Sequence, residues 1–248
     1  MTGAKRDRLF SSQRESNTPF RFDQEVAEVF DDMIRRSVPG YEAVLAGIAT
    51  LGRKYAQPRT LAYDLGCSLG SASLALQHAL NQGQLEAIEA LDFSAPMVER
   101  AAHRFTREAR ADGPTLQAHR EDITRAELRP ASIVILNFTL QFVDPSERDA
   151  LLTRIHRALV PGGALILSEK CTTDQPQDEA RFNGLHDEYR RLHGYSELEI
   201  AQKRRALERV LIPETVSAHE QRLRRVGFTV VQVWFQCFNF HSLLALKG

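Results

Sequence analysis

A glycine-containing turn is the first feature of this 248-residue chain that could do chemistry. Gly66 and Gly70 enclose Cys67, Ser68 and Leu69 at the point where an apolar segment changes to a helical pattern. Glycines at such a position let the backbone approach a ligand without an intervening side chain. The spacing is not Gly-x-Gly-x-x-Gly, and no Lys-Ser/Thr follows. A phosphate-cradling loop is therefore not predicted.

Polar side chains end three further apolar segments. Asp92 ends the second, where an acid can accept both hydroxyls of a ribose. Asp122 ends the third and is followed by apolar Ile123, a pair that suits the amino group and ring face of adenine. Asn137 ends the fourth. Together these residues predict a pocket for an adenosine without phosphates, although alone the turn could be structural and Asp92 a helix-capping acid.

The elements that would position these residues form an α/β pattern. Strands are expected at 61–65, 85–91, 115–120, 132–137 and 164–168, separated by helices, with a turn at 160–163; the third is the weaker one and the others are apolar. Such alternation predicts a buried parallel sheet. Two successive strands, 228–238 and 240–246, must then form an antiparallel hairpin. We expect a mostly parallel seven-stranded sheet that ends in this hairpin.

The remaining segments flank this sheet. Two helices are expected at 23–37 and 41–55, and residues 171–213 read as a helical insertion, with helices near 178–192 and 196–210. The insertion has too few apolar residues for a core of its own. We therefore predict a single domain over 23–248, preceded by a flexible arm over 1–22 that Phe10 and Phe20 could anchor.

Composition excludes several classes. The 32 basic and 32 acidic side chains balance, which argues against direct nucleic-acid binding. No apolar run reaches the roughly 18 residues of a membrane span, and no secretory signal is evident. Three distant cysteines fit a reducing cytoplasm, and the eight histidines show no metal-binding spacing. We expect a cytoplasmic protein that binds neither membrane nor metal.

The order of elements over 60–247 resembles the class I fold that binds S-adenosylmethionine. More specifically, the chain resembles the bacterial carboxy-S-adenosylmethionine synthase family over about 23–247. The segments that carry this resemblance are RSVPGY (36–41), YDLGCSLG (63–70), LNFTLQF (136–142), LSEK (167–170), GYSELEI (194–200), QKR (202–204) and WFQCFNF (234–240). The resemblance implies that S-adenosylmethionine and prephenate yield carboxy-S-adenosylmethionine and phenylpyruvate, and that the product is the carboxymethyl donor for wobble-uridine modification of tRNA.

The resemblance also implies roles for individual residues. Tyr41 and the turn residues Gly66, Cys67 and Ser68 would meet the methionine end of the ligand. Asp92 and the backbone of Phe93 would hold the ribose, although the family frequently has a small polar residue such as Asn at the latter position. The remaining contacts implied are Asp122 and Ile123 to adenine, and Asn137 at the end of the fourth strand.

The new carboxylate needs a cation, and the resemblance assigns this role to Arg204. It implies that Arg204 reaches the cofactor of the neighbouring subunit in a homodimer. The alternative for Lys203-Arg204-Arg205 is a solvated helix face. Arg36, Arg204 and His241 are candidates for the two carboxylates of prephenate. Glu169 and Lys170, after the fifth strand, are expected to form a local ion pair; the alternative is a role in the pocket.

The chemistry implied by the resemblance makes a protein base optional. The sulfonium acidifies its methyl group, the resulting ylide attacks CO2 released from prephenate, and the departing hydroxide takes the proton. No Asn/Asp-Pro-Pro-Tyr/Phe methyl-transfer signature follows the fourth strand, which agrees with this reaction. Two alternatives stay open: a small-molecule methyltransferase, which would not need Arg204, and a non-catalytic S-adenosylmethionine-binding subunit of a tRNA-modifying complex.

Overall fold

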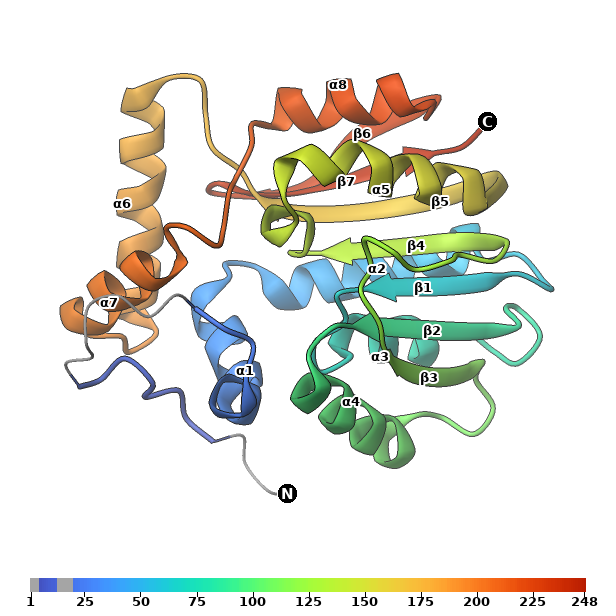
Figure 1. The fold of residues 1–248 in the computed structure, drawn as a ribbon, viewed down its shortest axis with the longest axis horizontal. Coiled ribbons are helices and arrows are strands. Elements are labelled where there is room, and N and C mark those ends of the chain that lie inside the picture. Colours follow the sequence, from blue (N-terminus) through green and yellow to red (C-terminus); the bar gives the residue numbers. More distant parts are fainter. Residues whose placement is uncertain (1–4, 13–19) are drawn as a thin grey trace.

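The computed structural model describes residues 5–12 and 20–248, so the predicted flexible arm lies partly outside the described residues. A single seven-stranded sheet with the order β3-β2-β1-β4-β5-β7-β6 organises the molecule (Figure 1). Its strands are β1 (Leu61–Leu65), β2 (Ala87–Asp92), β3 (Thr115–Arg120), β4 (Ala131–Asn137), β5 (Leu159–Lys170), β6 (Val230–Cys237) and β7 (Phe240–Leu246). The first five are parallel, and β7 is antiparallel to both β5 and β6. The predicted sheet and its terminal hairpin are confirmed.

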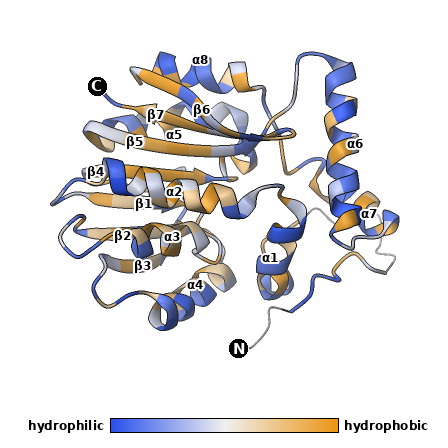
Figure 2. Ribbon diagram, turned by 180° about the vertical axis from the view of Figure 1, so that it is seen from behind, coloured by the Kyte–Doolittle hydropathy of each residue, from blue (hydrophilic) through white to orange (hydrophobic). Residues whose placement is uncertain are grey.

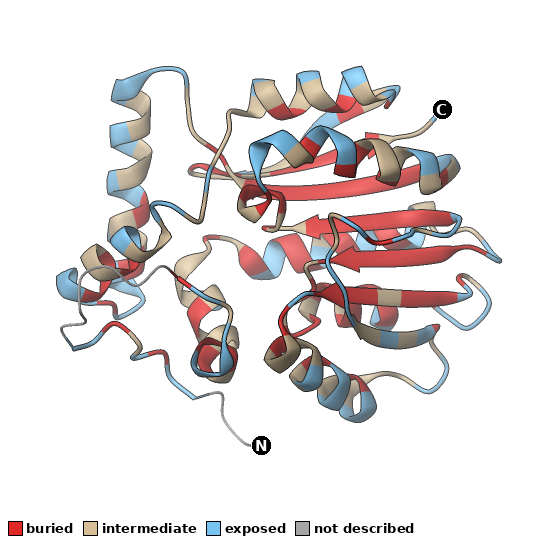
Figure 3. Cartoon of the chain, in the orientation of Figure 1, coloured by how far each residue is buried: buried red, intermediate tan, exposed pale blue. Residues whose placement is uncertain are grey.

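The central parallel strands are apolar because helices cover both faces, whereas β3, at the edge of the sheet, is partly exposed. Every residue of β1 is buried, and Figure 3 shows the central strands as an almost continuous buried layer. On one face lie α5 (Pro145–Ala158) and α8 (Val216–Val226), whose Leu152 and Leu223 join the core there. The other face is covered by α2 (Tyr41–Tyr55) and α3 (Ser71–Ala79), with α4 (Ala95–Glu108) packed beside α3 (Figure 2).

Three helices stand beyond the carboxyl ends of the parallel strands. They are α1 (Gln24–Ser37), α6 (Pro176–Leu192) and α7 (Glu197–Leu207), and the arrowheads of β1 and β4 point toward them in Figure 1. The last two belong to the predicted insertion. Their polar sequences pack on the N-terminal part of the same chain, where Phe10 and Phe20 are buried beside α1.

Capping residues explain where several of these helices begin. The Ser94 side chain accepts a hydrogen bond from the Met97 amide, as its position before Pro96 predicts. Ser196 and Glu199 form a capping box at the start of α7. None of the described helices is both long and apolar enough to cross a membrane.

Two local predictions need correction, and one short element was missed. The expected turn at 160–163 is a bulge inside β5: Ala131 pairs with Leu159 and Ile133 with Ala164, so four residues loop out without ending the strand. The second insertion helix ends at Leu207, earlier than the predicted 210. A short 3-10 helix, η1 (Leu140–Phe142), follows β4 and was not predicted.

Candidate functional site

A cavity of about 480 Å³ lies at the carboxyl ends of the strands, between the sheet and α1, α6 and α7. The ten residues predicted to contact S-adenosylmethionine or its carboxylated product all line it: Tyr41, Gly66, Cys67, Ser68, Asp92, Phe93, Asp122, Ile123, Asn137 and Arg204. Its size is that of a small-molecule site. The topology explains the convergence, because parallel strands bring their carboxyl ends to one edge of the sheet.

The glycine turn is held against β2 and the loop after β4. The Gly66 amide donates to the Leu91 carbonyl at 2.8 Å, and Gly66 has a φ of 78°. A Cβ there would lie 2.3 Å from Cγ2 of Thr139, so only glycine fits. Ser68 also adopts a left-handed conformation, with a φ of 49°. The backbone of the turn is thereby exposed to the cavity.

Asp92 fixes this turn as well as facing the cavity. Its Oδ2 accepts from the Ser68 amide and its Oδ1 from the Ser94 amide, both at 2.9 Å. Each oxygen keeps a further lone pair that can accept a hydroxyl of a ligand. Burial raises the pKa of Asp92, while the two amides oppose that shift. The helix-capping alternative is therefore partly right, because this carboxylate supports the start of α4 and the turn together.

Asp64 also lines the cavity, although sequence reasoning did not select it. Its Oδ2 accepts from the amide and hydroxyl of Ser73, at 3.0 and 2.5 Å. Burial raises its pKa to about 6. The sequence did carry a signal for Asp64, because it is an acidic residue at the next-to-last position of an otherwise apolar strand. Such a group is buried only when it is hydrogen-bonded.

At the end of β3, the loop at 121–123 leaves one carboxylate oxygen for a ligand. Oδ1 of Asp122 accepts from both the amide and the hydroxyl of Thr124 at 2.8 Å. Among the described residues, its Oδ2 has no hydrogen-bond partner. Ile123 packs against the core and has its carbonyl fixed by Arg154. Asp122 and Ile123 therefore offer a ligand one polar and one apolar contact side by side.

Asn137 presents an unsatisfied acceptor. Its Oδ1 is buried and has no hydrogen-bond partner in the described part of the chain. An orphaned buried acceptor is costly unless a bound group donates to it. The position next to the glycine turn suits the ammonium group of a methionine moiety.

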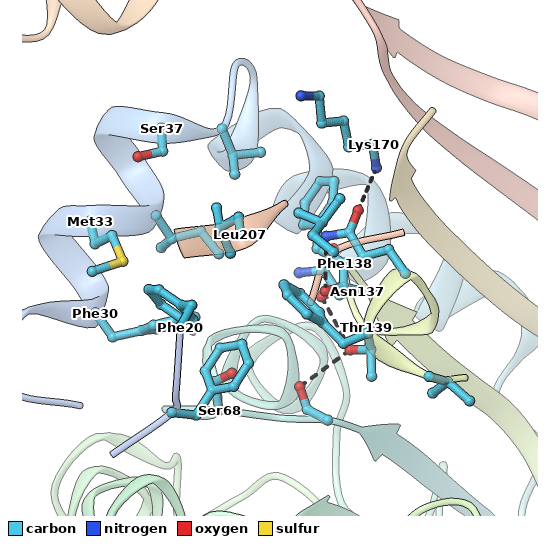
Figure 4. A pocket seen from close by; sticks show the side chains of 18 of the residues that line it. Phe20, Phe30, Met33, Ser37, Ser68, Asn137, Phe138, Thr139, Lys170 and Leu207 are labelled. Atoms are coloured by element: carbon cyan, nitrogen blue, oxygen red, sulfur yellow. Dashed lines mark hydrogen bonds between the residues drawn. The ribbon is translucent and has the colours of Figure 1, made fainter. Parts of the chain in front are cut away.

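Aromatic side chains close the cavity. Phe22 packs edge-on against Phe20 and Phe142, with ring centroids 5.2 Å apart in each pair, and against Phe93 at 6.3 Å. In Figure 4, Phe20, Phe30 and Met33 face Asn137, Phe138 and Thr139 across the cavity. Phe93 itself is 63% exposed, so the residue that departs from the family pattern forms part of the entrance.

Two other predicted residues are buried and chemically quiet. Burial raises the pKa of the Cys67 thiol well above its usual value, which leaves it unsuited to act as a nucleophile. Tyr41 begins α2, and burial raises its pKa to about 12. The Cys67 thiol and the Tyr41 hydroxyl are therefore uncharged, and both side chains form part of the cavity wall.

The cations of the cavity all come from the end of β5 and from the insertion: Lys170, Arg190, Lys203 and Arg204. Arg204 is 60% exposed and pairs with Asp187, which Arg190 also contacts. Lys203 is buried, donates to Ser37 at 2.9 Å and lies 3.8 Å from Asp7. Burial lowers the pKa of Lys203 to about 8.

The expected ion pair between Glu169 and Lys170 is wrong. Consecutive strand residues point to opposite faces, and Glu169 turns inward to accept from the Leu140 and Gln141 amides at 2.8 and 2.9 Å. Lys170 points the other way and lines the cavity. Burial is the largest contribution that raises the pKa of Glu169, to about 8.

Arg36 and His241, two candidates for carboxylate binding, do not line the cavity. Arg36 bonds Asp32, the Asp7 carbonyl and the His193 carbonyl, and its guanidinium lies 4.0 Å from the centroid of the Tyr195 ring. Burial lowers the pKa of His241, so this side chain is neutral near pH 7. Arg36 instead joins α1 to the segment around Asp7 and to His193 at the end of α6, and His241 lies in β7 opposite Glu169 of β5.

The residues present fit S-adenosylmethionine. The cavity offers the paired acceptors of Asp92, the unsatisfied Oδ1 of Asn137 and an open backbone at the turn. Among residues 5–12 and 20–248, no group of three or more His, Cys, Asp or Glu side chains could hold a metal ion.

Comparison with known proteins decides the family. The chain is 49% identical to the carboxy-S-adenosyl-L-methionine synthase of Marinobacter nauticus over 98% of this chain and 95% of that protein. It is 46% identical to the enzyme of the same name from Photobacterium profundum over 100% of both chains. The chain belongs to the carboxy-S-adenosyl-L-methionine synthase family. A family model described as a methyltransferase domain also matches residues 63–165.

Solved structures agree with this membership at the level of fold. An O-methyltransferase family protein from Burkholderia thailandensis superposes with a TM-score of 0.61 at 20% identity, covering 95% of this chain and 65% of that one. Human N-acetylserotonin methyltransferase, solved in complex with SAM, gives 0.59 at 17% identity, covering 91% and 57%. This synthase-family chain therefore has the class I methyltransferase fold.

Proposed function

We propose that this chain converts S-adenosyl-L-methionine and prephenate to carboxy-S-adenosyl-L-methionine and phenylpyruvate. The observation that carries the proposal is identity of 49% over nearly the full length of a relative with the synthase name. The cavity supports it, since acceptors for a nucleoside lie at one end and cations for carboxylates at the other. The product would supply the carboxymethyl group for modification of wobble uridine in tRNA.

In this proposal the residues of the chain bind and orient rather than exchange protons. Asp92 and Asp122 accept hydrogen bonds from ribose and adenine, and Asn137 and the turn hold the methionine end. Overall, the methyl group of S-adenosylmethionine loses a proton and gains CO2. Prephenate loses CO2 and hydroxide, and that hydroxide takes the proton to form water. The aromatic wall keeps bulk water from the reacting carbon.

The test is a mass measurement on the nucleoside after incubation with S-adenosylmethionine. We expect a product heavier by one CO2, formed only when prephenate is present, together with phenylpyruvate. A labelled methyl group that moves intact to an acceptor would instead identify a methyltransferase. Binding of S-adenosylmethionine without any turnover would support a non-catalytic subunit.

We further propose a cytoplasmic homodimer in which Arg204 reaches the partner's cavity. Leu185, Leu192 and Leu198, on α6 and α7, are exposed large apolar side chains that a second copy would cover. Arg204 is itself largely exposed and lies at the edge of its own cavity. The free state of Cys67, Cys171 and Cys237 is compatible with a reducing compartment.

Mixed subunits test this arrangement. The Asp92→Ala variant has a damaged pocket but an intact Arg204, and Arg204→Ala has the reverse. Activity should return when the two inactive variants are mixed, because a mixed dimer then contains one complete site. No recovery from variants that do exchange subunits would place Arg204 in the cavity of its own chain.

A further inference from the structure

Lys170 is a cation without a counter-ion inside the cavity. It follows the buried part of β5, and its amide donates to Oε1 of Gln141 at 3.1 Å (Figure 4). Among the described residues, no carboxylate lies within ion-pairing distance of its Nζ. A half-buried ammonium without a partner is costly, which makes an anionic ligand its natural complement.

Arg190 brings a second, more deeply buried cation to the same wall. Its side chain is 8% exposed, contacts Asp187 through one terminal nitrogen, and has a buried Nε without any partner in the described part of the chain. Asp187 must also serve Arg204. Among the described residues, Asp187 is therefore the only carboxylate that forms an ion pair with any of Lys170, Arg190 and Arg204, so three cations at this wall share one paired carboxylate.

The other polar groups nearby do not remove this excess. Lys203 already has Asp7 as its counter-ion. His186 is neutral near pH 7, because burial lowers its pKa to about 3. Its Nε2 forms a hydrogen bond of 2.7 Å with the Ser37 carbonyl. Burial, and then Arg190, lower the pKa of Lys170 to about 8, and the opposing effects of Asp187 and Glu179 do not cancel this shift.

We propose that Lys170 and Arg190 form the binding subsite for the carboxylates of the second, dianionic substrate. The inference rests on the proposed function, in which that substrate is prephenate. Asn137 pairs with Ser168 in the sheet, so Lys170, two residues further along β5, follows the strand end that would hold the methionine moiety. A dianion at this subsite would therefore be adjacent to the methyl group it must carboxylate. Arg204, at the exposed edge, is left for the carboxylate of the product.

Kinetics and direct binding test the subsite. For Lys170→Met we expect the KM for prephenate to rise at least about tenfold, since a charge-assisted contact is lost. The dissociation constant for S-adenosylmethionine should stay within about twofold. Lys170→Arg should recover most of the loss, because it retains the charge. Arg190→Met should act in the same direction, and Lys54→Met, a change at an exposed lysine of α2 outside the cavity, should have no effect.

Binding without turnover separates this claim from the proposed function. S-adenosylhomocysteine has no methyl group to react, so calorimetry in its presence gives the dissociation constant for prephenate itself. If the wild type neither binds prephenate nor makes the product, the proposed function fails. If the wild type does both and Lys170→Met binds prephenate equally well, only the subsite is wrong. If Lys170→Met lost the same affinity for S-adenosylmethionine as for prephenate, Lys170 would bind the methionine carboxylate instead, and the proposal would be overturned.

Discussion

The two ends of the cavity differ in the origin and the charge of their polar groups. At the strand ends of β1 to β3, Asp64, Asp92 and Asp122 are carboxylates that accept hydrogen bonds from the adjoining loops and helices. At the end of β5 and on α6 and α7, several cations line the cavity; among the described residues Lys170 has no ion-pair partner, and Arg190 shares Asp187 with Arg204. The first end is part of the general nucleoside-binding fold, whereas the second comes largely from an insertion. The chemistry that distinguishes this family is therefore expected at the second end.

Removal of Asp92 should give the largest effect on the nucleoside end. We expect Asp92→Ala to weaken S-adenosylmethionine binding by about 3 kcal/mol or more, because the ribose loses two charge-assisted partners and the Ser68 amide loses its acceptor. Calorimetry gives the dissociation constant, with Asp112→Ala, at an exposed turn, as the control. Unchanged affinity would remove Asp92 from the binding site.

Arg204 should affect the cationic end selectively. The Arg204→Ala variant should bind the carboxylated product about 2–3 kcal/mol more weakly, at the low end for a lost charge pair because Arg204 is largely exposed. Its affinity for S-adenosylmethionine should be nearly intact, since that substrate lacks the new carboxylate. Lysine should recover only part of the loss, because it cannot make a bidentate contact. The neighbouring Arg205→Ala, outside the cavity, is the matched control; equal losses for substrate and product would refute the assignment.

A smaller effect is expected from His186, which packs edge-on against Phe240 and bonds the Ser37 carbonyl at this end. Its folded-state pKa of about 3 lies below the usual 6.5, so the unfolded chain takes up the proton first as the pH falls. Its contribution to the free energy of unfolding should therefore drop by about 2 kcal/mol between pH 7 and pH 5. Urea unfolding at pH 7 and pH 5 gives the free energy of unfolding. We expect its drop between the two pH values to be about 2 kcal/mol smaller in His186→Gln than in the wild type. The exposed His103→Gln should retain the wild-type loss, and an unchanged loss in His186→Gln would mean that His186 is protonated in the folded state.

The nucleoside end was largely predictable because its signals are local. The bounds of β1 and β7 follow from apolar runs that stop at a glycine or begin at a tight turn, and the more polar β3 ends at charged residues. Asp92, Asp122 and Asn137 sit at strand ends, and parallel pairing alone brings strand ends together.

The cationic end was less predictable because it depends on contacts distant in sequence. The neighbours Glu169 and Lys170 look like an ion pair until the strand sends them to opposite faces. Arg36 has the charge of a substrate ligand, but it is engaged by the His193 carbonyl, 157 residues further along the chain. Neither hydrophobic periodicity nor motif spacing predicts a hydrogen-bond partner so far along the chain.

The bond between Tyr195 and Asp7 has a consequence for the order of events during synthesis. The Tyr195 hydroxyl donates to Oδ2 of Asp7 at 2.6 Å across 188 residues, and both side chains are buried. The segment around Asp7 can contact Asp32 and Arg36 of α1 early in synthesis, but its bond to Tyr195 must wait until β1 to β5 and α6 have been made. Contacts so far apart in sequence form slowly, because a long loop must close before they contribute. The cavity should thus be among the last parts of the newborn chain to mature, and shortened nascent chains should bind no nucleoside.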